Sequence, residues 1–222
     1  MSQPINYLQP DVPAVLPWHP LKTVIATNET LAGYGCLVPK ADYENFPVEI
    51  VQWPKIGGRP IDADTGNQAG TKQGIFDFWW EGEVLFGRNN AVHDEYLLGW
   101  SANPGEADRN KVLDKTPDRV LLWHANYHPD GGQLFFPITG APFVTPLALP
   151  GDDVSPDKFT NFYFDGSHGL YIHPGIWHEG IFPIATKASF FDKQGAVHGR
   201  VSVNFAQEFG VLLDVPFNTF SK

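Results

Sequence analysis

The sequence predicts a mainly β protein whose short strands form an antiparallel barrel or sandwich. Its 222 residues include 17 Phe, 7 Trp and 7 Tyr, which favour strands, and 22 Gly and 20 Pro, which favour tight turns. From residue 48 onward, short apolar runs alternate with turn clusters, and no helical periodicity separates them. A chain of this length commonly forms one such domain.

The elements follow in order from a proline-rich start. Residues 1–21 contain five prolines, which predicts an extended N-terminal arm that lies across the domain or a partner subunit, or frays. We expect residues 22–222 to form a single domain. Its first part indicates a strand, one or two helical turns opened by Thr27 or Asn28, and a second strand. Further strands are predicted at 48–53, 74–80, 83–87, 95–100, 119–128, 133–138, 143–149, 160–164, 169–172, 188–191 and 200–205.

Two long polar segments, 54–74 and 101–118, interrupt the strands. They are rich in Gly, Pro, Asp and Asn, which is typical of surface insertions. Loops of this length are either mobile or act as lids. We therefore expect both to lie on the surface.

Charge and composition exclude several classes of protein. The net charge of −10 argues against nucleic acid, which selects for basic surfaces. The single cysteine, Cys36, excludes an internal disulfide framework and a cysteine-rich zinc site. No apolar run approaches the roughly 20 residues of a membrane helix, and no signal segment is visible. We expect a cytoplasmic protein whose partner is a small anionic metabolite, provided that cations gather in a pocket.

Polar side chains recur at every second position of the strand predicted at 119–128. His124, Asn126 and His128 share one face, because successive side chains of a strand point to opposite sides. Inside a barrel, three such groups must bind one another, water, a metal or a ligand. On an outward face they are simply a polar surface. We interpret His124 as a buried histidine with satisfied hydrogen bonds.

Two turns bring further side chains toward this strand. The sequence PDGG after His128 predicts a tight hairpin that returns Gln133 to the same strand. A second turn, PG, lies between His173 and His178. We therefore expect His128, Gln133 and His178 to converge in one cavity with Asn126, and we count His173 as a further candidate.

These positions resemble the motifs of the cupin barrels. The first cupin motif is H-x-H-x(3,4)-E-x(6)-G, and the corresponding positions here are Asn126, His128, Gln133 and Gly140. The stretches HPDGGQLFFPITG, YIHPGIWHEG and ASFFDKQG are similar, within that superfamily, to the ureidoglycolate lyases. The resemblance implies that this single domain is a cupin-type β-barrel, also called a double-stranded β-helix or jelly roll. It further implies a homodimer that cleaves ureidoglycolate to glyoxylate and urea in purine breakdown, with a divalent metal such as nickel or zinc.

This reaction needs a base for the hydroxyl proton, an acid for the departing nitrogen and a cation for the carboxylate. The catalytic candidates are His128, His178, Gln133 and His173, since histidine titrates near neutrality. Alternatively, His128, His178 and Gln133 hold the metal ion. The candidates for substrate binding are Asn126, Lys193, Arg200, Tyr171 and Trp177.

Two substitutions keep other functions open. Asn126 and Gln133 stand where the cupin motif has a histidine and a glutamate, so no anionic ligand offsets the charge of a metal ion. Glu83 is the acid we consider first as a replacement. The alternatives are a metal-dependent oxygenase or isomerase on the same barrel, and a non-catalytic cupin that binds a carboxylate.

Overall fold

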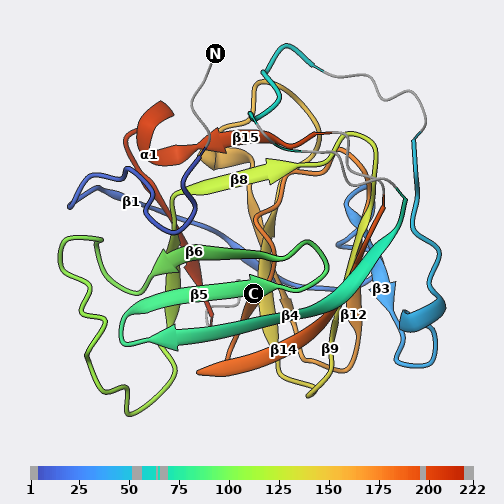
Figure 1. The fold of residues 1–222 in the computed structure, drawn as a ribbon, viewed down its shortest axis with the longest axis horizontal. Coiled ribbons are helices and arrows are strands. Elements are labelled where there is room, and N and C mark those ends of the chain that lie inside the picture. The colour runs from blue at the N-terminus through green and yellow to red at the C-terminus, as the bar shows by residue number, and fades with distance from the viewer. Residues whose placement is uncertain (1–4, 52–56, 64, 66–69, 196–198, 218–222) are drawn as a thin grey trace.

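A computed structural model describes residues 5–51, 57–63, 65, 70–195 and 199–217. They form a mainly β fold with large antiparallel sheets and little helix, which confirms the predicted fold class and is consistent with a cupin-like sandwich (Figure 1). The strands are β1 (Trp18–Pro20), β2 (Thr23–Ile25), β3 (Gly35–Val38), β4 (Lys72–Glu81), β5 (Val84–Asn89), β6 (Asp94–Trp100), β7 (Arg119–Leu122), β8 (His124–Tyr127), β9 (Gln133–Pro137), β10 (Phe143–Leu147), β11 (Thr160–Phe164), β12 (Gly169–Ile172), β13 (Phe182–Pro183), β14 (Lys187–Gln194), β15 (Val201–Asn204) and β16 (Leu212–Pro216). The helices are two 3₁₀ turns, η1 (Tyr43–Asn45) and η2 (Pro156–Lys158), and α1 (Phe205–Glu208).

The strands of the described residues form three sheets. The largest has the order β1-β16-β7-β6-β5-β4-β14-β9-β12-β3, a second has the order β13-β10-β11-β2, and β15 pairs with β8. The pairings are antiparallel except β1 with β16 and β2 with β11, where strands near the N-terminus add in parallel. The β8 strand is also bridged at Asn126 to His178, so the two histidine segments are held side by side.

The hydrophobic core lies between the two larger sheets. Alternation along β4 buries Phe76 and Phe78 on one face, and their rings stack at 4.3 Å. Phe190 of β14 meets Phe143 of β10 edge to face at 5.2 Å, so one aromatic cluster joins both sheets. Buried aromatic rings contribute large apolar areas to such a core. This core fixes the strands that surround the candidate site.

Some local predictions differ from the structure. Residues 28–34 form consecutive turns and no assigned helix, although Thr27 caps them by accepting a hydrogen bond from the Thr30 amide at 3.1 Å. The short α1 helix instead follows β15, and the Asn204 side chain caps it. Within the predicted strand 48–53, residues 52–53 lie outside the described residues, and Ile50 forms an isolated bridge to Gly131.

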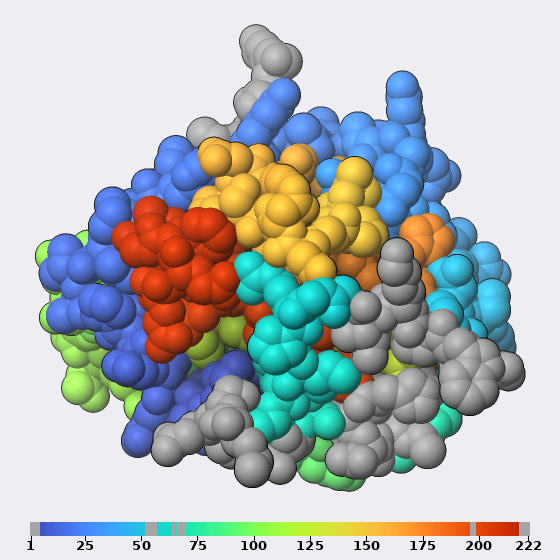
Figure 2. All heavy atoms as spheres, turned by 90° about the horizontal axis from the view of Figure 1, so that it is seen from above, coloured from blue at the N-terminus to red at the C-terminus, as the bar shows by residue number. Residues whose placement is uncertain are grey.

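The arm and the first long loop cover part of the molecule. Figure 2 shows N-terminal residues (blue) beside the segment after residue 57 (teal) and the C-terminal residues (red). Arg59 of this loop forms an ion pair with Glu208 of α1, with 2.8 Å between Nη2 and Oε2. No helix in the described part of the chain is long and apolar enough to cross a membrane.

Candidate active site

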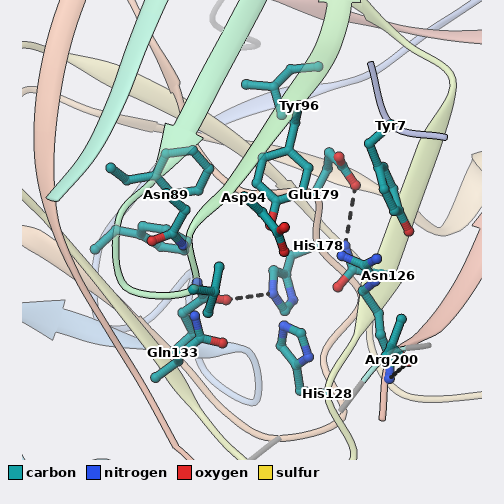
Figure 3. Close-up of a pocket in the computed structure, with 16 residues that line it drawn as sticks. Tyr7, Asn89, Asp94, Tyr96, Asn126, His128, Gln133, His178, Glu179 and Arg200 are labelled. Carbon is teal, nitrogen blue, oxygen red and sulfur yellow. Dashed lines mark hydrogen bonds between the residues drawn. The ribbon is translucent and has the colours of Figure 1, made fainter. Parts of the chain in front are cut away.

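A cavity of about 140 Å³ lies among β4, β5, β6, β8 and β9 (Figure 3). Cavities of roughly 150 Å³ hold a benzene-sized molecule, so this one suits a small metabolite. Its wall carries both apolar rings and polar side chains. The polar residues on which the argument depends are Asn126, His128, Gln133, His178, Glu179 and Arg200.

His128 and His178 face each other in the cavity. His128 follows directly after β8, and its ring centroid lies 5.4 Å from that of His178. Burial lowers the pKa of His128 well below its ordinary value, and the neighbouring His178 and Arg200 lower it further. His128 is therefore a neutral imidazole near pH 7, which can accept a proton.

His178, Gln133 and Asp192 form one hydrogen-bonded chain. His178 Nδ1 donates to the Ile176 carbonyl at 2.7 Å, and its Nε2 lies 3.1 Å from Gln133 Oε1. Gln133 Nε2 donates to Asp192 Oδ1 at 2.8 Å. Burial lowers the pKa of His178 and raises the pKa of Asp192 to about 6, although amide donors to the Asp192 carboxylate oppose that rise. Asp192 is completely buried, so the chain is insulated from solvent.

The hydrogen bonds of this chain limit where its protons lie. With Gln133 Oε1 against His178, both ring nitrogens face oxygen acceptors, which suits a doubly protonated His178 beside an ionised Asp192, although burial of His178 opposes that charge. If the Gln133 amide turns over, its Nε2 donates to a neutral His178 and its Oε1 accepts the proton of the Asp192 carboxyl. Both arrangements contain the same number of protons. The two arrangements differ in whether Asp192 or His178 carries the proton.

A second buried carboxylate, Glu179, follows His178 directly. Its Oε2 accepts hydrogen bonds from His124 Nδ1 at 2.6 Å and from Asn126 Nδ2 at 3.3 Å. His124 Nε2 lies 2.8 Å from the Ser202 hydroxyl, so both of its nitrogens have partners. The interpretation of His124 as a satisfied buried histidine is confirmed.

Arg200 supplies a positive charge at the cavity. Its side chain is 16% exposed, and Nε lies 3.5 Å from Asp62 Oδ2. The guanidinium carbon lies 4.3 Å from the centre of the Tyr7 ring. Arg200 precedes β15, and it is held between a carboxylate of the first long loop and a ring of the N-terminal arm.

Several buried polar atoms of the cavity lack a hydrogen-bond partner among the described residues. They are His128 Nδ1, Asn126 Oδ1, Arg200 Nε and the Tyr7 hydroxyl. Buried polar groups in folded proteins are almost always paired, with protein, water or ligand. Atoms of this kind that line one cavity indicate a site that receives a polar ligand.

Comparisons with known proteins relate this chain to one family. A family profile described as Ureidoglycolate lyase matches residues 119–208. A "Ureidoglycolate lyase" of Pseudomonas paraeruginosa (strain DSM 24068 / PA7) is 31% identical over 147 residues, which cover 62% of this chain and 86% of that protein. The chain belongs to the ureidoglycolate lyase family.

Two further relatives align over a shorter part. The "Ureidoglycolate lyase" of Stutzerimonas stutzeri (strain A1501) is 32% identical over 89 residues, 39% of this chain and 52% of that protein. The one from Azotobacter vinelandii (strain DJ / ATCC BAA-1303) is 34% identical over 91 residues, 40% of this chain and 55% of that protein. The segment matched by the ureidoglycolate lyase profile contains the five central residues of the cavity, His128, Gln133, His178, Asn126 and Arg200.

Four residues predicted for the site of this ureidoglycolate lyase family member lie outside the cavity. His173 Nδ1 and the Tyr171 hydroxyl both bind Glu49 Oε2, at 2.6 Å and 2.9 Å. Lys193 Nζ donates to the Phe46 carbonyl at 2.9 Å. Trp177 is buried in the core and donates to the Gly151 carbonyl at 3.0 Å.

Glu83, considered as a replacement for the missing glutamate, also lies elsewhere. It forms an ion pair with Lys111, with 2.6 Å between Oε1 and Nζ, and accepts from the Asp108 amide at 3.1 Å. The buried acids of the site are Glu179 and Asp192. Strand alternation carries a signal for Asp192, because it shares the buried face of β14 with Phe190 and Gln194. No local signal marks Tyr7, Asp94 or Tyr96, which reach the cavity from distant segments.

The donor set of this site fits a divalent metal ion poorly. His178 Nδ1 is engaged by a carbonyl and Nε2 by Gln133, which leaves His128 as the histidine with a free nitrogen. Among the described residues, no three or more His, Cys, Asp or Glu side chains are grouped so as to hold a metal. Arg200 adds a positive charge that disfavours a cation. We therefore derive the chemistry from the side chains themselves.

Proposed function

We propose that this protein cleaves ureidoglycolate to glyoxylate and urea by proton transfer between histidines. The unpartnered atoms of His128, Asn126 and Tyr7 in one small cavity beside Arg200 carry the proposal. The family relationship supports the substrate class. The cavity volume of about 140 Å³ suits a small acid.

His128 acts as the general base. Its lowered pKa keeps it neutral, and its Nδ1 has no hydrogen-bond partner among the described residues. It removes the proton of the substrate hydroxyl, the oxygen lone pair forms the carbonyl of glyoxylate, and the bond between this carbon and the urea nitrogen breaks. Positioned bases of this kind contribute about 10²–10⁴ in rate.

His178 acts as the general acid. In its doubly protonated form it holds a proton at Nε2 against Gln133, and that proton passes to the departing nitrogen to complete urea. The buried Asp192 carboxylate stabilises this form through Gln133. Burial lowers the pKa of both histidines, and the hydrogen-bonded Asp192 carboxylate is the group that favours the protonated form of His178.

The finer biological setting rests on the family resemblance. We propose a cytoplasmic homodimer that acts in purine (allantoin) breakdown. Light scattering of the purified protein tests the dimer, and a mass of one chain at working concentrations would contradict it.

The purified protein is expected to release glyoxylate and urea in equal amounts from ureidoglycolate. Because the chemistry uses side chains alone, turnover should survive exhaustive dialysis against EDTA. A His178→Ala variant should lose turnover. Stoichiometric iron in an active preparation, or loss of activity that added metal restores, would favour the alternative of a metal-dependent oxygenase or isomerase.

Arg200→Ala is expected to raise KM for ureidoglycolate by about tenfold to a hundredfold, because a charged hydrogen bond to a carboxylate is worth about 1.5–3 kcal/mol. The kcat should fall less, since the two histidines remain. Arg119→Ala is the matched control, because Arg119 pairs with Asp214 away from the cavity. Steady-state kinetics on both variants check the prediction, and equal KM values would contradict it.

A further inference from the structure

We infer that the N-terminal arm completes the active site, with Tyr7 as a positioning residue that holds Arg200 toward the cavity and closes the cavity on that side. The inference rests on the proposed function for the identity of the ligand. The geometry of the arm stands independently of it.

The arm is docked on the domain at several points. The Tyr7 carbonyl accepts from the Leu97 amide of β6 at 2.9 Å, and the Ala14 carbonyl accepts from the Gly105 amide at 2.8 Å. Ile5, Tyr7, Val12 and Leu16 also pack on the hydrophobic cluster of Val84, Phe86, Trp100, Leu121, Trp123 and Leu212. The position of Tyr7 is therefore set by backbone bonds and by apolar burial.

The Tyr7 ring contacts three groups of the site. It meets Tyr96 edge-on at 5.6 Å and His124 edge-on at 5.4 Å, and its face receives Arg200 at 4.3 Å. A guanidinium over an aromatic ring is attracted by the ring quadrupole, more strongly where water is excluded. Asp62 holds the same guanidinium from the loop. Without Tyr7, Arg200 would lose one of its two supports.

The Tyr7 hydroxyl is buried beside the Ser202 side chain, and no hydrogen bond of good geometry joins it to the described residues. Burial raises the pKa of Tyr7, so the hydroxyl stays protonated and is available as a donor. In Figure 3, Tyr7 and Arg200 lie on the same side of the cavity as Asn126. A carboxylate bound by Arg200 would give the hydroxyl an acceptor.

Tyr7 also lies between two spaces. An outer hollow of about 300 Å³ is lined by Ile5–Leu8 of the arm and by Asp62, and it shares Tyr7, Tyr96 and Arg200 with the inner cavity. The arm lies outside residues 119–208, the segment that matches the family profile. The histidines and Arg200 thus come from the family segment, whereas Tyr7 and Tyr96, which also line both spaces, come from elsewhere in this chain.

Chemical labelling of Arg200 tests the arm without any substrate. The variants are Tyr7→Ala, Tyr7→Phe and, as a matched control on the arm, Val15→Ala, because Val15 is 62% exposed. Each is treated with phenylglyoxal, and the modification of Arg200 is followed by peptide mass spectrometry. We expect labelling several times faster in Tyr7→Ala than in the wild type, and unchanged in the other two. Equal rates in Tyr7→Ala and wild type, or equal acceleration in Val15→Ala, would overturn the inference.

Steady-state kinetics distinguish the contribution of the Tyr7 ring from that of its hydroxyl. Tyr7→Ala should raise KM for ureidoglycolate more than it lowers kcat. Tyr7→Phe keeps the ring and should raise KM by about tenfold, because it loses one hydrogen bond to a charged group. A wild-type protein without turnover of ureidoglycolate would contradict the proposed function, whereas the labelling rates would still decide the role of Tyr7.

Discussion

His128→Gln is expected to lower kcat for ureidoglycolate cleavage about 10²–10⁴-fold, the contribution of a positioned general base. Glutamine retains hydrogen-bonding capacity at the position but cannot take up the hydroxyl proton. His173→Gln is the matched comparison. The structure places His173 against Glu49 and outside the cavity, so this variant should keep activity within about twofold.

The pH profile gives an independent check on His128. Its pKa is lowered well below the ordinary value by burial, by His178 and by Arg200, so it remains unprotonated as the solution is acidified. A base with a lowered pKa fails only when the pH drops through that lowered value. The acidic limb that His128 contributes to the profile of kcat/KM should therefore lie well below the ordinary pKa of a histidine. A His128→Gln variant with more than about a tenth of wild-type kcat would rule out the assigned base.

Asp192→Asn is expected to abolish most of the activity while the protein stays folded. An asparagine side chain would donate to Gln133, so Gln133 would turn its Nε2 toward His178 and fix that ring as a neutral acceptor. His178 would then lack the proton it hands to the leaving nitrogen. We expect a loss of about 10²–10⁴ in kcat. The nitrogen chemical shifts of the His178 ring, measured by NMR, should show the neutral form in the variant.

The stability of Asp192→Asn should differ from wild type in its dependence on pH. Burial raises the pKa of Asp192 to about 6 from the ordinary value of 3.8, a difference worth about 3 kcal/mol. Because the folded protein binds this proton more tightly than the unfolded chain, the protonated Asp192 contributes to stability below pH 4. That contribution is lost as the pH rises through 6. In thermal melts, the Tm of the variant relative to that of the wild type should rise between pH 4 and pH 7. A constant difference across this range, or unfolding of the variant at neutral pH, would contradict the assignment.

Strand alternation was sufficient to locate much of the site. Asn126 and His128 share a face because β8 is extended, and the turn before Gln133 returns that residue to the same cavity. The same rule places Arg200, Ser202 and Asn204 opposite the buried Val201 and Val203. These relations are local, since they depend on backbone period and turn geometry over a few residues.

The same local reasoning did not show which of two adjacent strand residues faces the interior of the protein. Lys193 and Asp192 are adjacent, and the resemblance drew attention to the lysine. The strand turns Asp192 into the protein and Lys193 toward the Phe46 carbonyl. His173 and Tyr171 likewise face Glu49, on the far side of the sheet from His178.

The sequence by itself determined the class of fold, the family and the candidate pair of histidines. Strand periodicity, turn residues and motif spacing depend on residues that are close together in the chain. Only the tertiary structure decided which charges surround that pair. Tyr7 and Arg200 reach the cavity from separate segments, and Asp62 and Asp192 act on it through their contacts with Arg200 and Gln133; only the packing of the sheets and the arm brings these groups together. The protonation of His128 and His178 depends on burial and on these neighbours. The proposed acid and base roles therefore depend on the tertiary structure.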